Sequence, residues 1–110
     1  MNANEYQVKA SRTMNPNLTE EEERNHALFG LVAEVGEICS IYQKELQGHP
    51  IDENHLRKEC GDVLWFFAEL HTHYGWDVET TMRMNIEKLE ERYPDGFDVD
   101  RSMHRKANDI

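Results

Sequence analysis

Two carboxylate pairs with the same spacing constrain this chain more than any other feature of its sequence. The first pair is Glu34 and Glu37, the second is Glu59 and Asp62, and the members of each pair are three residues apart. In a helix, residues three apart are surface neighbours with Cβ atoms about 5–6 Å from each other. Each pair therefore forms a two-pronged oxygen clamp if its segment is helical. The segment 47–52, which contains glycine and proline, is typical of a turn and predicts that the two helices fold back against each other.

Carboxylates that face one another in a core cannot all ionise unless a cation lies between them. Hard oxygen ligands of this kind suit Mg²⁺, with Mn²⁺ as a substitute. We therefore expect a divalent-metal site on a helical hairpin. The competing interpretation is a set of ordinary surface acids, because the chain has 22 acidic residues and short motifs often arise by chance.

Apolar periodicity and capping signals predict an all-α protein, built as an antiparallel bundle of about four helices. Thr19 and the three glutamates after it form a capping-box pattern that begins a long helix. The turn signal 93–96 follows the last helix, and the tail 97–110 is expected to be irregular. The expected helices cover residues 4–13, 20–46, 53–74 and 78–92.

Length and composition limit the classes of function. A chain of 110 residues predicts one domain, 1–110, and 38% hydrophobic residues is lean, so we expect dimerisation to complete the core. The net charge of −10 argues against a nucleic-acid polymer as partner. No apolar run approaches transmembrane length, so we expect no membrane partner. The two cysteines do not make a disulfide framework or a zinc site. The reducing cytoplasm is therefore the simplest compartment to expect.

One Glu-x-x-His pattern, from Glu23 to His26, raises the alternative of a di-iron bundle. His26 is eight residues before Glu34, which is roughly 12 Å along a helix axis. That distance is too long for the two residues to share a metal, so the iron interpretation is weak.

Three segments together resemble the MazG-like nucleotide pyrophosphohydrolases. They are residues 28–37 (LFGLVAEVGE), 59–65 (ECGDVLW) and 85–97 (NIEKLEERYPDGF). The resemblance extends from Ala10 to Arg105 and thus covers most of the chain. It implies an all-α, Mg²⁺-dependent enzyme that hydrolyses a nucleoside or deoxynucleoside triphosphate to the monophosphate and pyrophosphate, by attack of water on the α-phosphorus. It also implies a homodimer or a homotetramer made of two dimers.

The resemblance also assigns roles to individual residues. Lys88 and Arg92 match a basic pair that meets the phosphates, and Asn85 matches a polar residue near the site. Some relatives carry an acidic residue directly before the first clamp, where this chain has Ala33, so the identity of the general base stays open. The residues that match the metal ligands and catalytic carboxylates are Glu34, Glu37, Glu59 and Asp62.

Lys44 is a further phosphate candidate, chosen for its charge and its place late on the first long helix. Two other functions remain open: a nucleotide- or metal-binding protein without catalysis, and a helical oligomerisation module whose acids only solvate it.

Overall fold

Capping side chains determine where the two longest helices begin. The Glu22 backbone N–H donates to Thr19 Oγ1 at 3.1 Å, and the Thr19 N–H donates to Glu22 Oε1 at 3.0 Å. These two hydrogen bonds complete the predicted capping box. Hydrogen bonding of the Glu22 carboxylate, first by the Thr19 backbone N–H and then by the Thr19 side chain, lowers the pKa of Glu22 below its ordinary value. The Asp52 carboxylate accepts hydrogen bonds from the N–H groups of Asn54 and His55 at the start of the next long helix.

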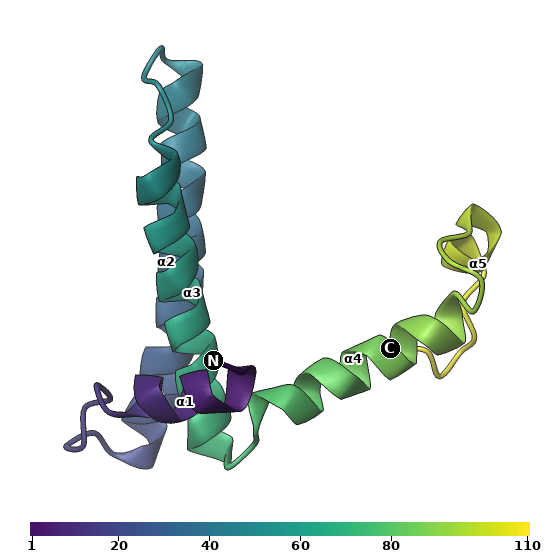
Figure 1. Cartoon of the computed structure of the whole chain (residues 1–110), viewed down its shortest axis with the longest axis horizontal. Coiled ribbons are helices and arrows are strands. Elements are labelled where there is room, and N and C mark those ends of the chain that lie inside the picture. Colours follow the sequence, from purple (N-terminus) through teal and green to yellow (C-terminus); the bar gives the residue numbers. More distant parts are fainter. The chain divides into compact units, whose positions relative to one another are not determined.

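The computed structural model describes residues 1–110, and all of its named elements are helices (Figure 1). The predicted all-α class is confirmed, and the four expected helices are present with bounds that agree to within two residues. The fifth helix was not expected. The helices are α1 (Ala3–Ser11), α2 (Glu20–Leu46), α3 (Glu53–Tyr74), α4 (Val78–Arg92) and α5 (Val99–Met103).

Contacts along the chain define two compact units, Met1–Asp77 and Val78–Ile110, and each is described by itself. The first unit contains α1, α2 and α3, and the second contains α4 and α5. The assignment of 1–110 as a single domain stays a prediction.

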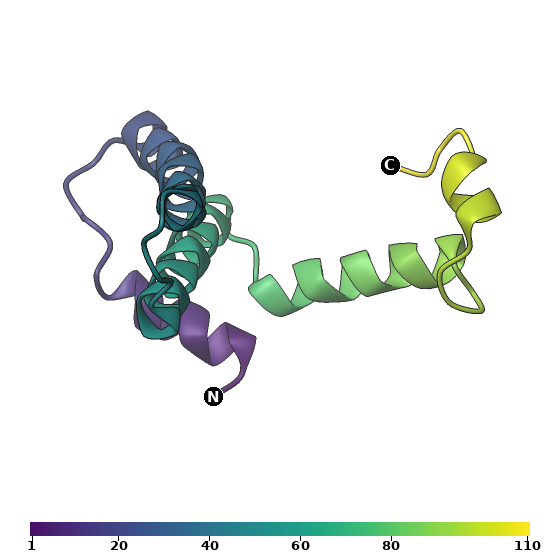
Figure 2. The ribbon, with the colours of Figure 1, turned by 90° about the horizontal axis from the view of Figure 1, so that it is seen from above.

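In the first unit, α2 and α3 form an antiparallel hairpin and α1 packs against α3 (Figures 1 and 2). Gly30 permits the close approach of the two long helices, because a Cβ added there would clash with the Phe66 ring. The Trp65 indole N–H donates to Thr13 Oγ1 at 2.8 Å and ties the first loop to α3. Gly75 ends α3 with a φ of 69°, a left-handed conformation that costs glycine little.

The first unit buries little apolar surface. Its buried hydrophobic residues are three alanines, Ala10, Ala27 and Ala68. Large apolar side chains on α2 stay in solvent, with Phe29 70% exposed and Val32 74% exposed. An isolated chain therefore leaves an apolar surface uncovered, and completion of the core by dimerisation stays a prediction.

In the second unit the chain turns back after α4 and passes through α5 (Figure 2). The Asp98 carboxylate caps α5 by accepting hydrogen bonds from the N–H groups of Asp100 and Arg101. The expectation of an irregular tail over 97–110 is therefore wrong for Val99–Met103, because this cap stabilises one short helical turn. None of the five helices combines the length and the apolar character needed to cross a lipid bilayer.

Candidate metal centre

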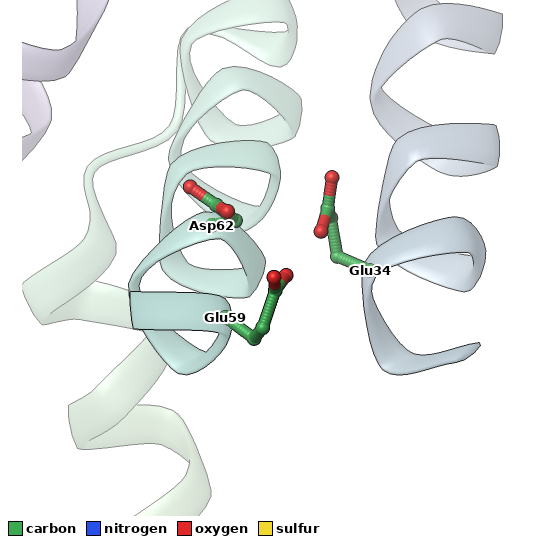
Figure 3. Close-up of side chains that lie close together, drawn as sticks. All are labelled: Glu34, Glu59 and Asp62. Carbon is green, nitrogen blue, oxygen red and sulfur yellow. The ribbon is translucent and has the colours of Figure 1, made fainter. Parts of the chain in front are cut away.

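Three of the four predicted carboxylates come together between the two long helices. Glu34 lies on α2, and Glu59 and Asp62 lie one turn apart on α3. Their carboxylate oxygens, one from each residue, all lie within 4.8 Å of one another. Figure 3 shows the Glu34 side chain reaching from α2 toward the two acids of α3. The hairpin thus joins one acid of the first pair and both acids of the second into one group of hard oxygen donors.

The electrostatics of the group favour a bound cation. The pKa of Glu34 is raised above its ordinary value. The largest cause is partial burial, followed by a hydrogen bond with Glu59 and then by the negative charges of Asp62, Glu59 and Glu37. A cation placed among these oxygens would reverse the repulsion and favour the ionised carboxylates. Carboxylate oxygens are the donors that Mg²⁺ and Mn²⁺ prefer, so the residues present fit such an ion.

Two predicted residues on α2 lie outside this group. Glu37 is exposed and is not among the three acids that converge, although its charge acts on Glu34. Lys44 is exposed, ten residues beyond Glu34, which is about 15 Å along the helix axis. The roles of Glu37 as a ligand and of Lys44 as a phosphate contact stay predictions.

The other predicted substrate residues, Asn85, Lys88 and Arg92, lie on α4 in the second unit. Asn85 is exposed, whereas Lys88 and Arg92 are half-buried. Arg92 binds Asp109 in a paired salt bridge. Contact of the three residues with a substrate stays a prediction from the family resemblance.

Two residues near the acids were missed by sequence reasoning. His55 Nε2 lies 3.1 Å from Glu59 Oε1 and hydrogen-bonds to it from one turn earlier on α3. Their i, i+4 spacing was a usable signal for this contact. The phenol of Tyr6 on α1 has a raised pKa, mainly because it is partly buried and secondly because the negative charge of Asp62 acts on it. No local signal could have identified Tyr6, since only the packing of α1 on α3 brings it under the influence of Asp62.

Two further histidines pair with glutamates across the hairpin. His26 Nδ1 on α2 lies 2.7 Å from Glu69 Oε1 on α3, and His73 Nδ1 on α3 lies 2.9 Å from Glu23 Oε1 on α2. Each helix therefore contributes one histidine and one glutamate to a reciprocal pair of bridges. The Glu23-x-x-His26 pattern, considered above for iron, joins the two helices here.

Comparisons with known proteins agree with this architecture. A family model described as the MazG nucleotide pyrophosphohydrolase domain matches residues 10–97. The chain is also similar to the Gene 37 protein of Mycobacterium phage L5, with 34% identity over an alignment of 73 residues that covers 62% of this chain. The chain spans 64% of the length of that relative. No solved structure matches the chain significantly.

Proposed function

The chain belongs to the MazG nucleotide pyrophosphohydrolase family, and we propose that it hydrolyses a nucleoside or deoxynucleoside triphosphate to the monophosphate and pyrophosphate. The observation that carries the proposal is the convergence of Glu34, Glu59 and Asp62 from two helices. This convergence supports the proposal, because three carboxylates from two helices form a group of oxygen donors that fits a divalent ion.

In this proposal Glu34, Glu59 and Asp62 hold Mg²⁺, and Mn²⁺ can replace it. When bound, the ion supplies charge neutralisation on the phosphate oxygens and lowers the pKa of a water molecule. Glu37, which is exposed beside the three acids, is a fourth ligand or orients that water. His55 keeps one oxygen of Glu59 in place by its hydrogen bond.

We also propose that the active form is a homodimer or a homotetramer. The exposed apolar residues of α2 support this assembly, because a second copy would remove them from water. The cytoplasm is the proposed compartment, because its reducing conditions would keep Cys39 and Cys60 as free thiols, the form they have in the structure.

The test is incubation of the full chain with a panel of nucleoside and deoxynucleoside triphosphates, with Mg²⁺, with Mn²⁺ or with EDTA. Ion-exchange chromatography of the products is expected to show a monophosphate and pyrophosphate only when metal is present. Diphosphate and orthophosphate would mean attack on a different phosphorus. Nucleotide binding without turnover would indicate a non-catalytic binder. If the chain neither binds nor hydrolyses any nucleotide, the oligomerisation module would be the remaining interpretation.

A further inference from the structure

A series of four contacts, here called the ladder, joins α2 to α3 at intervals of one helical turn, and the metal centre is its last step. The residues on α2 are three, four and four positions apart, and those on α3 are four, three and four positions apart. Such spacing places the residues of each helix on one face, so two stripes meet along the hairpin. From the open end of the hairpin to the turn at 47–52, the steps are His73 with Glu23, His26 with Glu69, Gly30 with Phe66, and Glu34 with Asp62 and Glu59.

The second step of the ladder holds a buried carboxylate. Glu69 is 2% exposed, and His26 Nδ1 lies 2.7 Å from its Oε1 and 3.0 Å from its Oε2. Because a carboxylate only accepts hydrogen bonds, His26 Nδ1 is the donor. The Trp65 and Phe66 rings also contact the imidazole, with ring centroids 6.2 Å and 5.4 Å from its own. The position in which His26 binds Glu69 is therefore defined by three residues of α3.

A buried polar contact of this kind specifies how one helix is aligned along the other. Apolar side chains can repack after a slide of one turn, about 5.4 Å, whereas a buried charged group loses its partner at a large cost. If α2 slid by one turn, Gly30 would oppose Glu69 and leave the buried carboxylate without a donor. In the same slide Glu34 would oppose the Phe66 ring. The bridge between His26 and Glu69 thus disfavours this alternative alignment.

We infer that Glu69 is a positioning residue for the metal centre. Its bridge to His26 sets the axial alignment of α2 on α3, and this alignment brings Glu34 to the two acids of α3. Glu34 is the one acid of the three that α2 supplies, so its distance from the other two depends on the alignment. His26 is eight residues from Glu34, about 12 Å along the axis, so the bridge acts through the helices and not by contact with the metal centre. The inference rests on the proposed function for the metal site and adds a role for Glu69.

Two substitutions of Glu69 separate positioning from a general effect on charge or stability. Glu69→Leu removes the bridge together with the buried charge, a kind of replacement that often preserves stability, so the chain should stay folded while the alignment becomes less specific. Glu69→Gln also removes the charge but keeps an acceptor for His26 Nδ1. Electron paramagnetic resonance of Mn²⁺ mixed with the full chain would measure the dissociation constant. Glu69→Leu is expected to weaken Mn²⁺ binding roughly tenfold, and Glu69→Gln is expected to retain most of the affinity.

The matched control is Glu45→Leu, which replaces an exposed acid near the end of α2 and should leave the Mn²⁺ affinity unchanged. Urea denaturation would give the free energy of unfolding of each variant and show whether a loss of affinity merely follows a loss of stability. Equal Mn²⁺ affinities in Glu69→Leu and Glu69→Gln would overturn the inference. If Glu69→Leu does not fold, Glu23→Leu and Glu23→Gln provide the same comparison at the first step, where the glutamate side chain is 26% exposed, with the same expected order of affinities.

The same experiment distinguishes failure of the inference from failure of the proposed function. If the unaltered chain binds no Mn²⁺, the proposed metal centre is refuted, and the inference with it. If it binds Mn²⁺ and Glu69→Leu binds the ion equally well, the inference alone is refuted. If Mn²⁺ binding follows the expected order but no nucleotide is hydrolysed, the proposed function alone is refuted.

Discussion

The two units of this chain place charge in opposite ways. The first unit contains 14 of the 22 acidic residues and six of the 12 basic ones, a formal charge of −8, and brings three carboxylates together. The second unit contains the remaining eight acidic and six basic residues, a formal charge of −2, and gathers five of those basic residues around one pocket. The pocket has an internal counter-charge in Asp109, whereas the three carboxylates have no lysine or arginine partner and are proposed to hold a cation. A charged cluster therefore indicates an external ligand most clearly when the chain itself does not neutralise it.

The largest expected effect comes from removing one carboxylate of the first unit. Asp62→Asn should reduce Mg²⁺-dependent turnover at least about a hundredfold, because the cation loses a charged ligand. Removal of Mg²⁺ with EDTA should abolish turnover of the unaltered chain. Glu45→Gln, an exposed acid on the same hairpin, is the control. Steady-state kinetics provide the measurement, and unchanged turnover in Asp62→Asn would remove this residue from the centre.

A second test concerns an acid of the first unit that does have an internal partner. Glu69 is 2% exposed, and both of its carboxylate oxygens lie within hydrogen-bond distance of His26 Nδ1. His26→Ala should lower the free energy of unfolding by about 3 kcal/mol, because a buried charged group loses its partner. Urea denaturation would measure the loss, with His49→Ala in the exposed turn as control. Equal stability of the two variants would show that the bridge contributes little.

A pair of glycine substitutions tests the close approach of α2 and α3. Gly30→Ala should destabilise the chain by about 2 kcal/mol, because the added Cβ would force the Phe66 ring to move. Gly36→Ala meets no atom within 4 Å and should stabilise the helix by up to about 1 kcal/mol. Thermal unfolding would compare them, and shifts of the same sign would contradict the packing described above.

The smallest expected effect is local and depends on pH. The pKa of Asp109 lies below its ordinary value of 3.8, so its ion pair with Arg92 stabilises the C-terminal segment fully above that value. The stabilisation should be lost as the pH falls through the lowered pKa. The NMR signal of the Arg92 Nε–H should report this titration, and a midpoint at or above 3.8 would argue against the bridge.

Local signals explain why the helix bounds were predictable. The capping box at Thr19, the Asp52 cap and the turn at 47–52 act over a few residues, so neighbours in sequence contain the necessary information. The short α5 was missed because its Asp98 cap supports only five residues, too few for an apolar period to emerge.

Helix rotation explains why the metal group was only partly predictable. Residues three apart in an α-helix differ by about 60° in direction, so both acids of a pair need not face the same neighbour. On α2, Glu34 turns toward α3 while Glu37 stays exposed. That choice depends on how the helices pack, including the contact of Gly30 with Phe66, and no spacing rule contains it.

The sequence by itself determined the all-α class, the four main helices and the family, because each depends on local patterns or on motifs in order. Only the tertiary structure decided that Glu34 joins Glu59 and Asp62, that His26 bridges to Glu69 and that Arg92 is held by Asp109. These contacts join residues that are distant in the chain or lie on different helices. They arise when side chains pack in three dimensions, which local propensity does not encode.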